Sequence, residues 1–169
     1  MKSFIALTFL GILTYAYSED PFSKCSKPKT VMDDYDATKW HSGKWYVTHV
    51  QKESTPTDCR TLTTSQDGDV SIVQHPYETG NGTLYCQGKK QEDNSLIFGC
   101  KSGEESMDKT IYIAVDTDYT DYALYYLCTS PTKGDLYENY LVARRKEGQK
   151  DIPQQLQSST SSLNLKQCK

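Results

Sequence analysis

Eight short runs of β-branched and aromatic residues, separated by turn-forming clusters, constrain the fold of this chain more than any other feature. Each turn cluster holds Gly, Pro, Asn, Asp or Ser, as in Asp67-Gly68-Asp69 and Glu92-Asp93-Asn94. The runs are 44–50, 60–64, 70–75, 83–87, 96–101, 110–116, 122–128 and 137–145. Because closing such a sheet removes its exposed edges, we predict an all-β fold, an eight-stranded up-and-down antiparallel barrel.

Residues 40–50 indicate how the barrel begins. Gly43 opens an alternating aromatic and β-branched run, which is typical of a turn that leads into a first strand. Trp45 follows two residues later and is large enough to fill one end of a small barrel. We therefore expect Trp45 at the closed end.

The first 18 residues have the pattern of a secretory signal peptide. Lys2 is the charged start, 4–13 are a short apolar run, and Ala16-Tyr17-Ser18 is a small-x-small cleavage site. We expect residues 19–169 to form one secreted domain. Aspartate and glutamate total 22 against 19 lysines and arginines, a balance that favours neither nucleic acid nor an anionic membrane as partner.

Six cysteines behind a leader predict three disulfides, and the sequence alone allows 15 connectivities. No Cys-x-x-Cys pair occurs, so we do not expect a zinc or redox site. We expect no other metal and no cofactor. Asn81-Gly82-Thr83 is a glycosylation sequon. Near the C-terminus, Asp151-Ile152-Pro153 predicts the start of a short helix, whose apolar stripe is Ile152, Leu156 and Leu163.

Three separated motifs resemble the signature regions of lipocalins. They are Gly43-x-Trp45, the turn Thr117-Asp118-Tyr119, and an arginine at the end of the eighth run. The resemblance implies that Arg145 stacks on Trp45, a cation–π contact of about 0.5–2 kcal/mol, although Arg144 is an alternative. The leader and residues 43–49 and 115–119 are similar to the triabin-like branch of salivary lipocalins from blood-feeding triatomine bugs. By this resemblance the disulfides are Cys25–Cys128, Cys59–Cys168 and Cys86–Cys100.

The resemblance implies a secreted, monomeric protein that inhibits host haemostasis. The leading hypothesis is inhibition of platelet aggregation by capture of a small agonist, an eicosanoid such as thromboxane A2, inside the barrel. If Trp45 points inward, Val47 and His49 share its side of the strand. The expected lining of the lumen is Val47, His49, Ile111, Ile113, Tyr125 and Leu127.

Three alternatives remain at this stage. Acidic loops at 67–69 and 92–93 favour a protein–protein inhibitor of a clotting protease or contact-activation factor. His75 would be the axial ligand of a haem and nitric-oxide carrier. Asp121, taken as lying at the barrel mouth, would pair with a biogenic amine. No Gly-x-Ser-x-Gly or His-Glu-x-x-His motif occurs, and we do not expect an enzyme.

Overall fold

The computed structural model describes residues 20–53, 58–76, 83–102, 105–132 and 134–169. The predicted leader and the Asn81 sequon therefore lie outside the described residues. The regular elements are α1 (Ala37–Trp40), β1 (Gly43–Val50), β2 (Thr61–Asp67), β3 (Val70–Pro76), β4 (Thr83–Lys90), β5 (Leu96–Ser102), β6 (Glu105–Thr117), β7 (Tyr122–Ser130), β8 (Tyr137–Arg144), η1 (Gln154–Leu156), α2 (Gln157–Thr160) and β9 (Lys166–Gln167).

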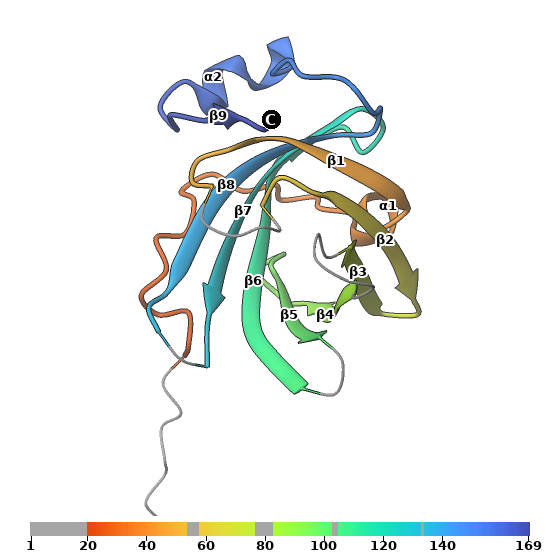
Figure 1. The fold of residues 1–169 in the computed structure, drawn as a ribbon, viewed down its shortest axis with the longest axis vertical. Coiled ribbons are helices and arrows are strands. Elements are labelled where there is room, and N and C mark those ends of the chain that lie inside the picture. The colour runs from red at the N-terminus through yellow and green to blue at the C-terminus, as the bar shows by residue number, and fades with distance from the viewer. Residues whose placement is uncertain (1–19, 54–57, 77–82, 103–104, 133) are drawn as a thin grey trace, which may run out of the picture.

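Strands β1 to β8 close into the predicted antiparallel barrel (Figure 1). Each strand from β2 to β7 pairs with the next along the chain, and β1 pairs with both β8 and β2. The first half of β1 pairs with β2 from Gly43↔Thr64 to Tyr46↔Thr61. Its last residues instead pair with the short β9, so the C-terminal tail extends the sheet beside β1.

The segments outside the barrel cover parts of its surface. The short α1 begins at an N-cap, Asp36, whose carboxylate accepts hydrogen bonds from the backbone N–H groups of Thr38 and Lys39. At the other end of the chain, η1 and α2 lie across β1 and β8 (Figure 1). Leu156 is fully buried there against Leu124 and Val142, with Ile152 and Leu163 beside it. The predicted C-terminal helix and its stripe are thus present, and the helix is short.

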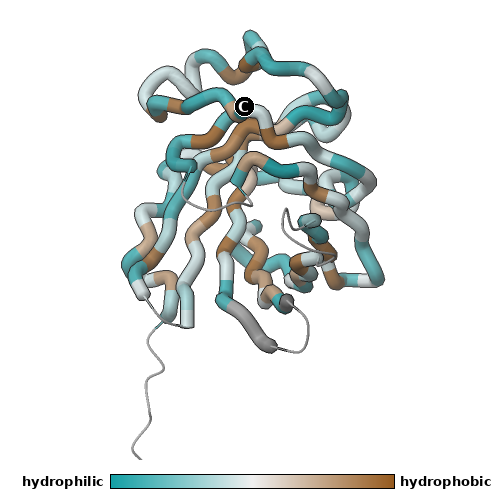
Figure 2. The backbone as a smooth tube through the Cα atoms, in the orientation of Figure 1, coloured by the Kyte–Doolittle hydropathy of each residue, from teal (hydrophilic) through white to brown (hydrophobic). Residues whose placement is uncertain are grey.

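Brown, apolar stretches alternate with teal, polar ones along the strands of the barrel (Figure 2).

Within the described part of the chain, no helix is both long and apolar enough to cross a bilayer.

Three disulfides cross-link the fold: Cys25–Cys128, Cys59–Cys168 and Cys86–Cys100. These are the pairs that the resemblance implies. The first attaches the N-terminal segment to β7, and the second attaches the C-terminal tail to the segment before β2. The third joins β4 to β5, where Cys86 and Cys100 face each other in the ladder. Disulfides of this number are typical of an extracellular protein.

Candidate functional site: the barrel interior

The interior of the barrel is one continuous buried cluster to which all eight long strands contribute. Because side chains alternate between the two faces of a strand, cluster membership shows which positions point inward. The inward positions include Trp45, Val47, Val50, Leu62, Val73, Cys86, Leu96, Phe98, Tyr112, Ala114, Ala123, Tyr125, Leu141 and Ala143, with Leu84, Cys100 and Leu127 partly buried against them. Val47, Tyr125 and Leu127 are thus on the predicted side.

Aromatic rings fill one end of this interior, which we call the floor. Trp40 stacks on Trp45, with their ring centroids 5.5 Å apart, and also contacts Tyr112 at 4.9 Å. Tyr112 in turn contacts Tyr125 at 5.0 Å. Trp40 and Trp45 are at most 1% exposed. Trp45 therefore closes the barrel as predicted, and Trp40 adds a second indole that the sequence analysis did not place.

Arg145 closes the floor from outside. Its guanidinium carbon lies 3.7 Å from the centroid of the Trp45 ring. The same guanidinium donates hydrogen bonds to five backbone carbonyls, those of Lys39, Trp40, Ser42, Lys44 and Tyr119. It thereby joins three segments that are distant in sequence: the end of α1, the start of β1 and the β6–β7 turn.

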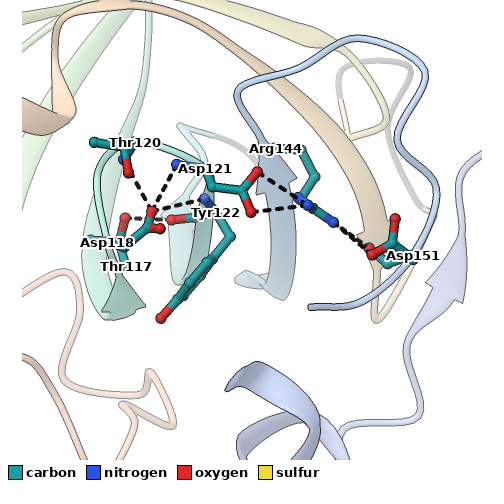
Figure 3. Close-up of polar contacts among 7 residues, drawn as sticks. All are labelled: Thr117, Asp118, Thr120, Asp121, Tyr122, Arg144 and Asp151. Carbon is teal, nitrogen blue, oxygen red and sulfur yellow. Dashed lines mark hydrogen bonds and ion pairs between the residues drawn. The ribbon is translucent and has the colours of Figure 1, made fainter. Parts of the chain in front are cut away.

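The β6–β7 turn is fixed by its own side chains (Figure 3). Thr117 Oγ1 donates to the carbonyl oxygen of Tyr122, and Asp118 Oδ1 accepts from the N–H groups of residues 120, 121 and 122. Tyr119 has a left-handed backbone, with φ of 66°. Its hydroxyl accepts from the backbone N–H of Asp36. The signature turn therefore holds the segment before α1 against the floor.

Arg144 and Asp121 lie on the outside of this same end. Arg144 forms ion pairs with Asp121 at 3.1 Å and with Asp151 at 2.9 Å (Figure 3). The choice between the two adjacent arginines is thereby settled, because Arg144 serves the outer surface and Arg145 the floor. The expectation that Asp121 lies at the mouth is wrong, since its backbone carbonyl accepts from Arg145 N–H beside the closed end.

The structure corrects the predicted orientation of Ile111 and Ile113. Both pack in a second cluster, together with Phe22, Tyr126 and the Cys25–Cys128 disulfide. That cluster lies on the outer face of β6 and β7, where the N-terminal segment covers it. Tyr112 and Ala114 point into the barrel instead. Both faces of β6 are apolar because both are buried, so alternation alone does not identify the inner face.

His49 is also outside the lumen, because β1 contains an irregularity. The pairing with β8 shifts between Val47 and His49, so that Val47 faces Ala143 but His49 faces Val142. Val142 belongs to the outer cluster under the C-terminal helix. His49 Nδ1 lies 3.0 Å from the Thr48 hydroxyl, and β9 pairs beside it. The extra residue inverts the alternation of side chains along β1. Strict alternation after Val47 would place His49 inward, but Val50 takes the inward position instead.

The opposite end of the interior, which we call the mouth, has polar side chains on its walls. Asp58, 4% exposed, accepts a hydrogen bond of 2.7 Å from the hydroxyl of Tyr137. Asn139, fully buried, donates to that same tyrosine oxygen and accepts from the backbone N–H groups of Gln51 and Lys52. These contacts fix a carboxylate, a phenol and an amide on the β8 side.

Arg60 and His75 lie on the β2–β3 side of the mouth. Arg60 is 7% exposed and donates through Nη1 to the carbonyl oxygen of Pro76. His75 shares its face of β3 with Val73, and its ladder partner is Leu84. The pKa of His75 is lowered to about 4, mainly by burial and also by the charge of Arg60, while the charge of Asp58 opposes this shift. The imidazole is therefore neutral at physiological pH.

The sequence analysis did not place Arg60 in the site. The sequence offered one signal, because Arg60, Leu62 and Thr64 occupy alternate positions of the predicted second run. In the structure all three side chains are buried. His75, considered there only as a haem ligand, does lie on the lumen side, and its role as such a ligand stays a prediction.

Several buried polar atoms of the floor have no hydrogen-bond partner among the described residues. They are Tyr35 Oη, Trp40 Nε1, His41 Nε2 and Tyr112 Oη, each on a side chain no more than 6% exposed. His41 Nδ1 donates to the carbonyl oxygen of Ala37 at 2.8 Å, which leaves Nε2 as an acceptor in the neutral ring. Buried polar atoms of this kind are normally satisfied by water or by a ligand.

Two grooves with acidic linings lie on the outer surface. One, of about 540 Å³, runs between the segment before α1 and the β2–β3 hairpin; its acidic residues are Asp33, Asp34, Asp36 and Asp69. The other, of about 490 Å³, lies beside the β4–β5 turn and includes Asp20, Glu92 and Asp93. The loops singled out as acidic therefore contribute to grooves.

Comparison with known proteins identifies the family. The model of the Triabin family matches residues 19–159. Procalin from Hospesneotomae protracta is 39% identical, and the match covers 99% of each chain. The chain belongs to the triabin family. This triabin-family protein is also 33% identical to Triafestin-1 of Triatoma infestans, over 86% of this chain and 79% of that one. With Pallidipin of Meccus pallidipennis the identity is 30%, covering 88% and 84%.

Solved structures agree with the barrel fold of the triabin-family chain. LTBP1 in complex with LTC4 superposes with a TM-score of 0.68 and 23% identity, covering 88% of this chain and 92% of that one. A biogenic amine-binding protein superposes with a TM-score of 0.54 and 16% identity, covering 81% and 78%. The family is one of lipocalin binding proteins and not of enzymes.

Proposed function

We propose that this chain is a secreted salivary protein that binds a small amphipathic host ligand in its barrel. The proposed ligand is an eicosanoid such as thromboxane A2, and the proposed consequence is inhibition of platelet aggregation in the host. The observation that carries the proposal is the interior itself. It joins an apolar wall to a mouth that holds one buried cation, Arg60, and a floor with unsatisfied polar atoms.

The comparisons support this proposal without deciding the ligand. One structural neighbour holds leukotriene C4, an eicosanoid, and another is a biogenic amine-binding protein. Both ligands are small and amphipathic, which is the class we propose here. Membership of the triabin family is the basis for proposing an anti-haemostatic role, as the sequence resemblance implies.

Calorimetry with purified, disulfide-intact protein tests the proposal. A stable thromboxane A2 analogue, leukotriene C4 and tryptamine are titrated separately, and platelet aggregation induced by the thromboxane analogue is measured in parallel. We expect saturable binding of at least one eicosanoid and a matching loss of aggregation. If neither the thromboxane analogue nor leukotriene C4 gives a heat of binding, capture of an eicosanoid in the barrel is wrong.

The two acidic grooves favour a second candidate, a protein–protein inhibitor that binds a basic surface of a clotting protease or contact-activation factor. Asp33, Asp34, Asp36 and Asp69 place four carboxylates around one groove, with Lys90 as the basic residue among its lining. Thrombin clotting time and kallikrein generation at saturating protein test it. Unchanged values in both assays would remove this candidate.

Secretion and a monomeric state complete the proposal. Processing after residue 18 and glycosylation at Asn81 are tested by N-terminal sequencing and by a mass shift on deglycosylation. Sedimentation velocity tests the monomer.

A further inference from the structure

The floor of the barrel holds four buried polar atoms that nothing in the described part of the chain satisfies. They belong to Tyr35, Trp40, His41 and Tyr112, whose side chains are between 1% and 6% exposed. A buried polar group without a hydrogen-bond partner costs free energy in the folded protein. Four of them on adjoining side chains indicate a place where a further molecule completes the hydrogen bonds.

These side chains are neighbours, and they adjoin the lumen. The ring centroid of Trp40 lies 4.7 Å from that of His41 and 4.9 Å from that of Tyr112. Tyr35 lies 6.3 Å from Tyr112 on the same measure. Trp40, Tyr35 and Tyr112 belong to the buried cluster that also forms the apolar wall of the lumen. His41 contacts that cluster through Phe98, with the two centroids 6.0 Å apart. The apolar wall therefore ends at these polar atoms.

Two of the four atoms have a fixed hydrogen-bonding role. The indole Nε1–H of Trp40 is a donor only. His41 Nδ1 lies 2.8 Å from the carbonyl oxygen of Ala37, which only accepts, so Nδ1 carries the proton and Nε2 of the neutral ring is an acceptor. The hydroxyls of Tyr35 and Tyr112 take either role. The complementary group on a ligand must therefore both accept and donate.

A charged group does not meet these requirements. Arg145 lies 3.7 Å from the centroid of Trp45, and Trp40 stacks on Trp45 at 5.5 Å. An ammonium group would bring a second positive charge toward this guanidinium and has no acceptor for Trp40. A carboxylate only accepts, so it would leave His41 Nε2 unpaired and would also lose its own hydration.

We propose that the floor binds a hydroxyl group at the buried end of the ligand, with Trp40 Nε1 donating to the hydroxyl oxygen and His41 Nε2 accepting from its O–H. A hydroxyl does both through one oxygen atom. Tyr112 supplies a further hydrogen bond to the same group. This inference rests on the proposed function and names the feature by which the ligand is selected, since an eicosanoid that ends in a hydroxyl is favoured over one that ends in a methyl group.

The first experiment changes only the end of the ligand. Arachidonic acid and its ω-hydroxy and ω-carboxy derivatives are titrated into wild-type protein by calorimetry. We expect the ω-hydroxy acid to bind about thirtyfold more tightly than arachidonic acid, because a methyl end leaves the buried polar atoms unpaired. The ω-carboxy acid should bind no better than arachidonic acid.

The results separate this inference from the proposed function. Equal affinities of the ω-hydroxy acid and arachidonic acid would overturn the assignment of the floor and leave capture in the barrel intact. A preference for the ω-carboxy acid would overturn it as well. Absence of binding by all three acids, and by the thromboxane A2 analogue, would count against the proposed function and the inference together.

The second experiment removes the acceptor. His41→Asn keeps a donor for the Ala37 carbonyl but lacks Nε2. We expect the preference for the ω-hydroxy acid over arachidonic acid to fall about tenfold. His49→Asn, on the outer side of β1, is the matched control and should keep the full preference. Circular dichroism verifies the folding of both variants. A folded His41→Asn protein with an unchanged preference contradicts the proposal.

The third experiment distinguishes a hydroxyl that serves the ligand from one that serves the fold. Tyr112 Oη has no partner among the described residues, so Tyr112→Phe should leave the melting temperature of the ligand-free protein unchanged or raise it by about 2–4 °C. The same change should weaken binding of the ω-hydroxy acid about fivefold and leave arachidonic acid unaffected. Tyr140→Phe, in the outer cluster, is the matched control. A melting temperature below that of the control, with the preference intact, would show that the hydroxyl is bonded within the fold and would contradict the proposal.

Discussion

The guanidinium of Arg145 lies over the indole of Trp45, 3.7 Å from the ring centroid, and bonds to five backbone carbonyls at the same time. A planar group with fixed donors meets all these requirements together, whereas an ammonium group does not. The pair thus joins the floor of the barrel to the end of α1, the start of β1 and the β6–β7 turn.

Arg145→Lys should therefore destabilise the barrel although it keeps the charge. We expect the free energy of unfolding to fall by about 2–4 kcal/mol, since several hydrogen bonds to backbone carbonyls and the stacking contact are lost together. Urea denaturation followed by tryptophan fluorescence measures this. The neighbouring surface change Lys146→Arg is the control and should lie within about 0.5 kcal/mol of wild type. A variant as stable as that control would contradict the role given to Arg145.

His41 makes the stability of the floor depend on pH. Burial lowers its pKa to about 4, while its hydrogen bond to Ala37 opposes the shift and the charge of Arg145 adds to it. Between the ordinary pKa and this lowered value the unfolded chain binds more protons than the folded one. The free energy of unfolding therefore rises with pH through this window and is lost as the pH falls from about 6.5 toward 4.

His41→Asn should remove part of this dependence. Asparagine keeps a neutral donor for the Ala37 carbonyl but does not titrate. We expect the slope of unfolding free energy against pH to decrease between about pH 6.5 and 4, by an amount on the order of one proton. An unchanged slope in the variant would show that His41 is not the group responsible.

Gly88 is required where β4 meets β5. A Cβ placed there would lie 2.6 Å from Phe98 Cδ1 and 2.8 Å from the carbonyl oxygen of Ile97. Gly88→Ala should therefore displace Phe98 from the interior and destabilise the barrel by about 1–3 kcal/mol. Gly99→Ala, on the facing strand, meets nothing within 4 Å and is the matched control. Thermal unfolding of both variants tests this, and similar melting temperatures would contradict it.

Cys59 lies between the two charged residues of the mouth, Asp58 and Arg60, and is bonded to Cys168 in the C-terminal tail. The paired change Cys59→Ala with Cys168→Ala should leave the barrel folded but release the segment that carries Arg60. We expect the affinity for the proposed eicosanoid ligand to fall, because the segment that carries Asp58 and Arg60 at the mouth is then less fixed. An unchanged affinity, measured by calorimetry, would contradict this role of the disulfide.

The barrel was predictable because its local signals agree. The turn clusters separate β-branched and aromatic runs of a length suitable for strands. The order of Gly43, Trp45 and Arg145 along the chain gives further support to the barrel. The inner face was predictable only in part. On β7, Tyr125 and Leu127 point inward as expected, but on β6 the N-terminal segment buries the outer face and makes Ile111 and Ile113 equally apolar.

The remaining errors arise from features that have no local signature. The irregularity after Val47 depends on pairing with β8, and nothing in residues 43–50 announces it. The mouth combines Arg60, His75 and Tyr137 from three separate strands or their ends, so their meeting is a property of the closed barrel.

The two long-range disulfides overlap along the chain, from Cys25 to Cys128 and from Cys59 to Cys168. Any single peptide bond broken between Cys25 and Cys168 consequently leaves both fragments covalently attached. A protease in the surrounding fluid that nicks one loop would thus release no piece of the molecule, and the damage would become visible by mass only after a reducing agent is added.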